Sequence, residues 1–289
     1  MARRNFDDLN SVQVAEVRFD ACRMPITFNA GRIRSTAAKV DKKTIAERRC
    51  FLCGENRPAE QEGIEYGRYT ILINPFPIFK NHLTIPDSSH TDQMMNAERM
   101  GEMLDLAHDL SDWAIFYNGP KCGASAPDHL HLQAGIFDCQ LLTANYPYKI
   151  LLADSKESFR KIYDSLPVTD GEEEPRMNVI AFRKGNHVSL IVIPRRAHRP
   201  HCYTAEGDKH YLISPGALDM GGLIVTPRRE DYDRLTADKA LDILCEVGVR
   251  TEPTIDVGIM QGKEIEFTLN SPYHLRNSLR QGTFTAHLT

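Results

Sequence analysis

The chain has 289 residues, of which 42% are hydrophobic and 26% are charged, which is enough for one large or two medium hydrophobic cores. Its net charge of −4 argues against a protein that binds nucleic acid or a membrane surface. No apolar run reaches the ~18 residues of a membrane span, and the polar start MARRNFDDLNSVQ argues against a signal peptide. The seven scattered cysteines are typical of a reduced compartment, so we expect a cytoplasmic protein.

The N-terminal region contains a periodic apolar segment followed by a basic segment. Apolar side chains between residues 7 and 23 have a spacing that predicts an amphipathic helix, and residues 26 to 29 predict a short strand. Arg32, Arg34 and Lys39 come next. Taken by itself, this basic segment predicts a solvated loop.

Cys50 and Cys53 form a CxxC pair in a segment that predicts a loop. In a reduced chain such a pair indicates a zinc or a redox site. A thioredoxin-like pair would open a helix after a strand, so we favour zinc, which needs two more ligands for a closed tetrahedral site. His90 and His129 are the candidates and His82 is a rival for the third position, while two buried cysteines without metal are the alternative.

Residues 69 to 86 predict two strands joined by a turn that contains two prolines. Asn74 begins this turn, and asparagine often takes such a position for its own local hydrogen bonds. A helix that reaches about residue 110 from a cap at residues 91 and 92, and then a strand over residues 113 to 117, are predicted to follow.

The stretch NGPKCGASAPDHLHLQAG, residues 118 to 135, carries the most distinctive pattern in the chain. Its glycines and prolines predict a turn, and the alternation from residue 129 to 133 predicts a strand. That alternation places His129, His131 and Gln133 on one face and two leucines on the other. Two imidazoles and a carboxamide on one face indicate a functional surface, and two histidines lining a solvated strand are the alternative.

The turn before this strand has the composition of an anion-binding loop. Gly123 and Ala124 can direct successive backbone N–H groups toward one point, and Ser125 adds a hydroxyl donor. A phosphate held beside an imidazole nitrogen indicates covalent catalysis, in which histidine attacks phosphorus and carries the nucleotide transiently.

The pattern NGPxxGxS followed by HxHxQ resembles the active-site strand of the histidine-triad superfamily. Glutamine in the third position is similar to the transferase branch, which comprises galactose-1-phosphate uridylyltransferase, diadenosine tetraphosphate phosphorylase and the GDP-hexose phosphorylases. The resemblance implies that His131 is the nucleophile, that Gln133 holds the phosphoryl oxygens of the intermediate and that Ser125 contacts phosphate.

The same resemblance implies a nucleotide or nucleotide-sugar substrate and a structural zinc ion. The turn with Asn74 is similar to a hairpin that binds ribose hydroxyls, and Arg32 lies in a segment similar to one that approaches substrate phosphate. The candidate substrate-binding residues are Asn74, Asn118, Gly123, Ala124 and Arg32, and the implied metal ligands are Cys50, Cys53, His90 and His129.

The pattern of the first half recurs in the second half without HxHxQ, and both halves contain Pro-x-x-x-His, at Pro86 and at Pro194. We therefore expect an α+β fold similar to the duplicated uridylyltransferase fold, with two antiparallel sheets and helices packed on one side. The predicted parts are a catalytic half at 1–150, a degenerate second half at 151–250, and a β-hairpin tail at 251–289 that could begin a further module.

The function that follows is nucleotidyl transfer in two displacements. A nucleoside monophosphate moves to His131 and then to phosphate or a sugar 1-phosphate. Two alternatives are a hydrolase of the same fold, in which water is the acceptor, and a non-catalytic, zinc-stabilised module that binds nucleotides. We expect neither nucleic acid nor a membrane as a partner, and no residue identifies the base or the sugar.

Overall fold

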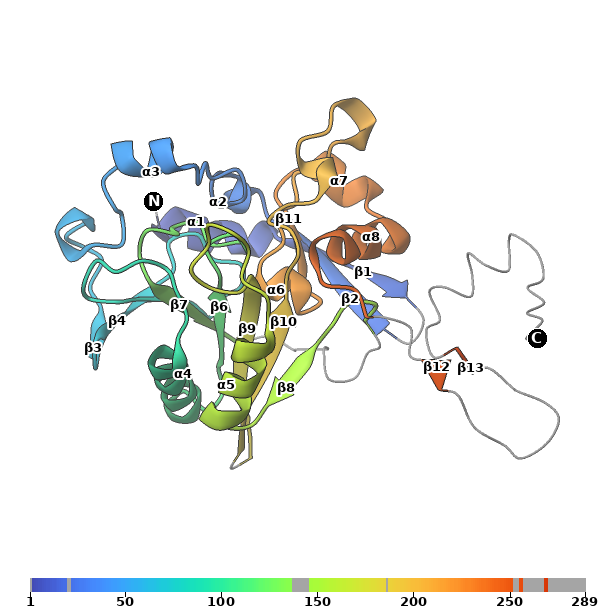
Figure 1. Ribbon diagram of the computed structural model, residues 1–289. Helices are drawn as coiled ribbons and strands as arrows, with labels where there is room; N and C mark the ends of the chain where they lie inside the picture. Colours follow the sequence, from blue (N-terminus) through green and yellow to red (C-terminus); the bar gives the residue numbers. More distant parts are fainter. Residues whose placement is uncertain are drawn as a thin grey trace, which may run out of the picture.

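The computed structural model describes residues 2–19, 22–136, 146–185 and 187–251, together with two short strands at 255–256 and 268–269. Within these residues, eight strands form one antiparallel sheet (Figure 1). Their spatial order is β3 (Ile64–Tyr66), β4 (Tyr69–Ile73), β5 (His82–Pro86), β7 (His131–Gly135), β6 (Ala114–Asn118), β9 (Met177–Lys184), β10 (His187–Pro194) and β8 (Leu151–Ala153). The predicted α+β class is confirmed.

The helices are mostly short. Those described are α1 (Ala2–Asp7), α2 (Ile33–Thr36), α3 (Lys42–Glu47), α4 (Ala97–Asp109), α5 (Lys156–Ser165), α6 (Ala217–Met220), α7 (Arg229–Arg234) and α8 (Ala237–Val247), with 3-10 turns at Asp8–Ser11, Ala30–Arg32, Gly54–Asn56, His201–Tyr203 and Gly207–Lys209. Among the helices that the structure describes, none combines the length and the apolar character needed to cross a membrane.

One face of the large sheet packs against α4 and α5 (Figure 1). Met103 and Leu106 of α4 and Phe159 of α5 are fully buried there, in one cluster with Leu132 of β7 and Val179 of β9. Because side chains alternate along a strand, the residues between these apolar ones point to the opposite face. That alternation directs His131 and Gln133 away from the helices.

α4 begins later than the sequence predicts. It starts at Ala97, where Asn96 Oδ1 accepts the backbone N–H of Arg99 at 2.9 Å, and not at residues 91 and 92. Residues 91–93 instead bond to the loop before β7, with Leu130 N–H donating to Thr91 O at 2.6 Å. This pairing uses backbone groups that a helical turn would need, so a long-range contact displaces the predicted helix start.

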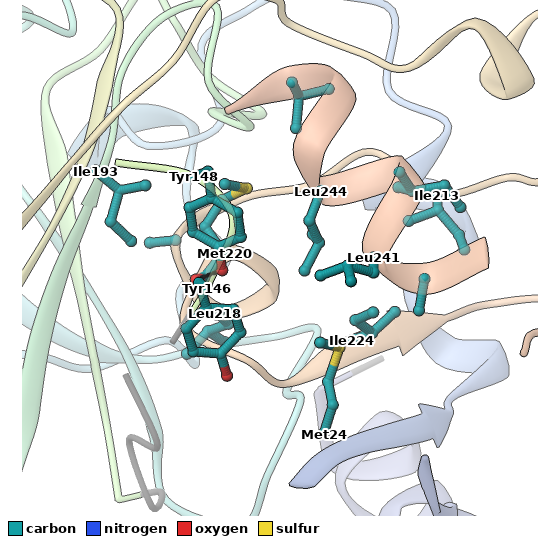
Figure 2. Packing of buried hydrophobic residues seen from close by; sticks show 14 of the residues in the cluster. Met24, Tyr146, Tyr148, Ile193, Ile213, Leu218, Met220, Ile224, Leu241 and Leu244 are labelled. Atoms are coloured by element: carbon teal, nitrogen blue, oxygen red, sulfur yellow. Dashed lines mark hydrogen bonds between the residues drawn. The ribbon is translucent and has the colours of Figure 1, made fainter. Parts of the chain in front are cut away.

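The opposite face of the sheet carries a second layer. β1 (Gln13–Phe19), β2 (Cys22–Phe28) and β11 (Ile224–Thr226) form a three-stranded sheet in which β11 runs parallel to β2. Figure 2 shows the core between the layers, where Met24 of β2 and Leu241 and Leu244 of α8 lie in one cluster with Ile193 of β10. This layer holds N-terminal and C-terminal segments together on one side of the large sheet.

The amphipathic helix predicted over residues 7 to 23 is wrong. α1 ends at Asp7, and the following segment forms β1 and the start of β2, paired from Gln13 opposite Phe28 to Phe19 opposite Cys22. Apolar residues at positions 12, 14, 17 and 19 fit a strand period as well as a helical one. Pairing with β2, which lies between β1 and β11, decides in favour of the strand.

The two predicted halves join within the large sheet. β6 belongs to residues 1–150 and β9 to residues 151–250, and they pair from Ile115 opposite Ala181 to Asn118 opposite Asn178. The hairpin predicted at 69–86 is confirmed as β4 with β5, and the hairpin of β9 with β10 repeats this arrangement in the second half. The division at residue 150 stays a prediction, since the sheet runs through it.

Little of the predicted tail is described. β12 (Ile255–Asp256) pairs antiparallel with β13 (Thr268–Leu269), as a hairpin over this region requires. The other residues of the predicted hairpin, 257–267, lie outside the described residues.

Candidate active site and metal centre

A pocket opens on the face of the large sheet that turns away from α4 and α5. The residues predicted as catalytic or substrate-binding all line it: Arg32, Asn74, Asn118, Gly123, Ala124, Ser125, His131 and Gln133. Apolar side chains, among them Leu72 and Ile78, line it as well. The second half adds a wall that the sequence patterns did not reveal, made of His198, Arg199, Ser214, Gly216, Ala217, Leu218, Asp219 and Val225.

His131 is buried at the start of β7 with its two ring nitrogens in different roles. Nδ1 lies 2.8 Å from the carbonyl oxygen of His129, which can only accept, so Nδ1 carries the proton. Nε2 therefore keeps its lone pair, and it has no hydrogen-bond partner among the described residues. Burial lowers the pKa of His131 to about 4, which keeps the imidazole neutral at physiological pH.

Gln93 clamps the backbone of His131. Its Oε1 accepts the His131 N–H at 2.7 Å, and its Nε2 donates to His131 O at 3.1 Å and to Asn118 O at 2.8 Å. The side chain is 1% exposed, so these bonds hold β7 and the end of β6 in a fixed relation. Gln93 is not predictable from the local pattern, because the helix predicted from residues 91 and 92 includes this residue.

A chain of hydrogen bonds fixes the orientation of the Gln133 amide. The backbone N–H of Ile78 donates to His82 Nδ1 at 3.0 Å, so the proton of His82 is on Nε2. Nε2 then donates to Gln133 Oε1 at 3.0 Å. The NH₂ group of Gln133 is left to donate into the pocket, as a residue that binds phosphoryl oxygens requires.

His82 is therefore a neighbour of Gln133 and is not part of the metal cluster, so its candidacy as a ligand is wrong. The ring lies between Phe79 and Phe116, at centroid distances of 4.9 and 5.9 Å. Burial, together with the charge of Arg32, lowers the pKa of His82 to about 3, so the ring stays neutral.

Asn74 lines the pocket with its amide already engaged. Oδ1 accepts the N–H of Phe76 at 2.9 Å, and Nδ2 donates to Thr84 Oγ1 at 2.7 Å. These bonds give Asn74 the turn-forming role that its residue type favours. Its contact with ribose stays a prediction.

The loop that is predicted to bind an anion is held against the second half. Gly123 has φ +99°, and a Cβ at this position would lie 2.6 Å from the Cα of Gly216. Asn118 Oδ1 accepts from the N–H of Ala217 at 2.7 Å and from Asn178 Nδ2 at 3.0 Å. Residues of both halves thus determine the shape of the loop that contains Ala124 and Ser125.

Arg32 is part of the pocket, whereas its basic neighbours Arg34 and Lys39 are exposed. Its Nη1 donates to Phe76 O at 2.6 Å. Burial lowers the pKa of Arg32 to about 10, partly offset by the nearby charge of Asp219. The solvated-loop interpretation is therefore wrong for Arg32.

The four implied metal ligands lie together. The donor atoms of Cys50, Cys53, His90 and His129 are all within 4.8 Å of one another. Cys50 Sγ lies 3.2 Å from His129 Nδ1, and Cys53 Sγ lies 3.1 Å from His90 Nδ1. Sulfur and nitrogen ligands of a tetrahedral zinc ion are roughly 3.5 Å apart, so this donor set fits a metal ion.

His129 is oriented for such a role. It precedes β7, because its N–H donates to Ala126 O in a turn, so the strand predicted from residue 129 begins at His131. Its Nε2 lies 2.8 Å from the carbonyl oxygen of Asp87 and must donate the proton, which leaves the Nδ1 lone pair facing the cysteines. The predicted row of three side chains on one face holds only for His131 and Gln133.

Comparisons with known proteins bear on this geometry. Residues 1–136 match a family model described as a domain of unknown function, DUF4922. No curated protein sequence matches the chain. The crystal structure of yeast Ap4A phosphorylase Apa2 is similar with a TM-score of 0.57 at 15% sequence identity, over 86% of this chain and 97% of that chain. The chain has the fold of that enzyme.

Two further crystal structures of the yeast enzyme agree. The complex with Ap4A has a TM-score of 0.55 at 16% identity, and the complex with AMP has a TM-score of 0.55 at 14% identity. Each covers 86% of this chain and 96% of the other. At this coverage the likeness spans both predicted halves.

Proposed function

We propose that the protein is a nucleotidyltransferase that carries a nucleoside monophosphate on His131 and passes it to phosphate or a sugar 1-phosphate. The observation that supports this most directly is the His131 imidazole, which keeps Nδ1 protonated on a carbonyl and leaves Nε2 with its lone pair in a pocket. The similar yeast enzyme is an Ap4A phosphorylase, and its solved complexes contain Ap4A and AMP.

In the first displacement, Nε2 of His131 attacks the α-phosphorus of the donor. A nitrogen–phosphorus bond forms while the bond from phosphorus to the bridging oxygen breaks, and the electron pair leaves with that oxygen. The ring becomes cationic, and the His129 carbonyl, 2.8 Å from Nδ1, stabilises it. The Gln133 amide, the Ser125 hydroxyl and the N–H groups of the loop at 123–125 donate to the phosphoryl oxygens.

In the second displacement, an oxygen of the acceptor attacks the same phosphorus from the vacated side. The nitrogen–phosphorus bond breaks and its electron pair returns to Nε2, so His131 ends the cycle neutral and singly protonated, as it began. With inorganic phosphate as acceptor the product is a nucleoside diphosphate. With a sugar 1-phosphate it is a nucleotide sugar.

The metal centre in this proposal holds zinc in a structural role. Cys50, Cys53, His90 and His129 would complete four ligands, which leaves no open position for a reacting water. Its contribution is positional, because the His129 that it would hold also supplies the carbonyl that binds His131 Nδ1.

The test of this proposal is the adduct. After incubation with Ap4A, nucleoside triphosphates or nucleotide sugars, mass spectrometry should place a nucleoside monophosphate on His131, and the bond should be acid-labile and base-stable. His131→Ala should abolish both the adduct and turnover, while His108→Ala, on an exposed ring in α4, should change neither. Turnover without any adduct in the wild type would contradict the mechanism.

The fate of the adduct distinguishes the alternatives. Transfer to phosphate or a sugar 1-phosphate supports a transferase, whereas equal loss to water with and without acceptor would indicate a hydrolase. Nucleotide binding with neither adduct nor turnover would indicate the non-catalytic module.

A further inference from the structure

Two segments of the second half contribute His198, Arg199, Ser214, Gly216 and Ala217 to the pocket wall, and we name these five residues the second-half wall. Arg195 supports the backbone of this wall from the protein interior. Its side chain is buried, and it donates to Pro215 O at 3.0 Å and, through Nη2, to the carbonyls of Ala197 and His198, both at 3.2 Å. One guanidinium therefore ties the two segments of the wall together.

The same guanidinium connects the wall to the anion-binding loop. Arg195 Nη1 donates to Asn178 Oδ1 at 2.5 Å, and Asn178 Nδ2 donates to Cys122 O at 2.7 Å and to Asn118 Oδ1. Asn178 is fully buried. A buried network whose members are all bonded is rigid, so the wall stands in a fixed position beside the loop that would receive the α-phosphate.

Arg199 presents its charge on this wall. Its Nε donates to Ser214 Oγ at 3.1 Å, its Nη2 donates to Ala38 O at 2.9 Å, and its guanidinium lies over the ring of Tyr203 at 4.1 Å. Over the described part of the chain no carboxylate forms an ion pair with Arg199, and its Nη1 has no hydrogen-bond partner. The side chain is held in place and its charge is left uncompensated.

The surroundings of Arg199 are also positive. His198 lies next to it in the pocket, and the charged groups that act on His198 are Arg199, Arg195, Arg176 and Lys121. Burial and these four cations together lower the pKa of His198 to about 4. Arg176 and Lys121 share one partner, Glu172, so the cations at this wall outnumber the carboxylates.

The acidic side chain of the pocket does not cancel this charge. Asp219 is 9% exposed, and its two oxygens accept the N–H groups of Gly216 and Val225, at 2.9 and 3.0 Å. The cations whose charges act together with Asp219 are Arg32, on the N-terminal segment, and the buried Arg195, while Asp219 is not among the groups that act on Arg199. Among the described residues no carboxylate neutralises Arg199, so its charge is available to an anion that enters the pocket.

We propose that the second-half wall is an anion subsite, in which Arg199 with Ser214 binds the phosphate chain beyond the α-phosphorus of the donor. This inference rests on the proposed function and specifies its donor as a nucleoside or dinucleoside polyphosphate. When Nε2 of His131 bonds to the α-phosphorus, the bridging oxygen leaves with the electron pair, and the negative charge of the departing polyphosphate increases by one. A guanidinium fixed beside that group stabilises the increase.

Binding of inorganic tripolyphosphate tests the subsite without nucleotide or turnover. By titration calorimetry the wild type should bind tripolyphosphate more tightly than orthophosphate. Arg199→Gln should weaken tripolyphosphate binding by roughly 10- to 100-fold, the scale of one charge-assisted hydrogen bond. Arg196→Gln is the matched control, because Arg196 is exposed on the same loop and does not line the pocket, so it should bind as the wild type does.

Ser214→Ala removes the hydroxyl that holds Arg199 Nε and keeps the charge. This variant should also weaken tripolyphosphate binding, by a smaller factor than Arg199→Gln. If the melting temperature shows that Arg199→Gln is poorly folded, Ser214→Ala is the test variant. Equal affinity of the wild type for tripolyphosphate and orthophosphate, or equal affinity of Arg199→Gln and wild type for tripolyphosphate, would overturn the inference.

Labelling of His131 separates the inference from the proposed function. Adenosine 5′-phosphorimidazolide and Ap4A present the same α-phosphorus, but the first loses imidazole and the second loses ATP. Arg199→Gln should reduce the labelling rate with Ap4A at least 10-fold more than the rate with phosphorimidazolide. An equal reduction with both donors would contradict the subsite, whereas no labelling of the wild type by either would contradict the proposed function and leave tripolyphosphate binding to decide the subsite.

Discussion

At the scale of single residues, the orientation of one side-chain amide depends on a proton on a neighbouring ring. Gln133 can donate into the pocket only because His82 Nε2 donates to its Oε1, and His82 can do so only because the Ile78 N–H occupies Nδ1. His82 would not touch the reacting atoms. It is a positioning residue for Gln133, although its residue type and place in the chain made it a candidate metal ligand.

Substitution of His82 tests this positioning. His82→Leu keeps an apolar side chain between Phe79 and Phe116 but removes the donor, so kcat should fall by roughly 10- to 100-fold with a small change in KM. His82→Gln restores an N–H donor and should recover most of kcat. Steady-state kinetics with the donor that labels His131 is the measurement.

A purely structural role for His82 would give a different pattern. Both variants would then lose kcat in proportion to their loss of melting temperature. Equal activity of His82→Leu and wild type would show that the Gln133 amide is oriented by other contacts, such as Asn74 Nδ2 at 3.4 Å.

At the scale of elements, the CxxC segment, the end of β5 and the start of β7 meet at the metal cluster. Leu52 is buried with the two cysteines and Ala126, in a cluster separate from the main cores. Because this cluster contains so few apolar side chains, packing stabilises the segment only weakly. Ligation of a metal ion would contribute additional stability. The segment also contributes Phe51 and Leu52 to the pocket wall.

Removal of one ligand should therefore affect both metal content and stability. The purified wild type should contain about one equivalent of zinc, as expected for a single four-ligand site. Cys50→Ser should lose it and lower the free energy of unfolding by roughly 2–4 kcal/mol, within the range for a lost metal site. Metal analysis and urea denaturation are the measurements.

Cys202→Ser is the matched control, because Cys202 is about as buried as Cys50, at 6% against 8% exposure, and lies outside the cluster. It should keep the metal. A metal-free wild type that is as stable as the metal-treated protein would contradict a structural role for the metal.

At the scale of the whole molecule, one buried carboxylate connects segments of both halves. Glu174 lies just before β9 and is 4% exposed. It accepts the Tyr117 hydroxyl of β6 at 2.8 and 2.9 Å and the N–H of Met95 at 2.6 Å. Burial raises the pKa of Glu174 from its ordinary value of 4.5 to about 7.

The stability of the fold should depend on this proton. Between pH 4.5 and 7 the folded protein keeps a proton that the unfolded chain has released, so the contribution of Glu174 is full below pH 4.5 and is lost as the pH rises to 7. Glu174→Gln removes this titration. The free energy of unfolding of the wild type, relative to that of the variant, should decrease by roughly 2–3 kcal/mol from pH 5 to pH 8.

Urea denaturation at several pH values measures the difference. Glu157→Gln, at an exposed position of α5, is the control and should follow the wild type at every pH. Parallel curves for wild type and Glu174→Gln would show that the buried carboxylate titrates near its ordinary pKa.

The parts of the site that the sequence predicted are those that local chemistry determines. The strand with His131 and Gln133, the glycine-containing turn and the four metal ligands are short patterns whose residue types have few other uses. Gln93, Arg195 and Arg199 were not predicted, because loop packing brings them to the site from distant positions. Arg199 lines the pocket, whereas Gln93 and Arg195 hold the backbone around it. The helix predicted near the N-terminus is wrong because this segment pairs with the adjacent strand β2, which itself pairs with the distant strand β11, and apolar spacing alone indicates neither contact.

The asparagine pair at the junction of β6 and β9 also has a consequence for assembly. Asn118 and Asn178 stand opposite each other, and their neighbours Tyr117 and Val179 point to the helix-covered face. A slip of one residue would bury the Asn178 amide among apolar side chains and leave the Arg195 guanidinium without its acceptor, each a cost of several kcal/mol. Mispairing of β6 with β9 is therefore unfavourable. The register that joins the two halves is also the register that completes the pocket.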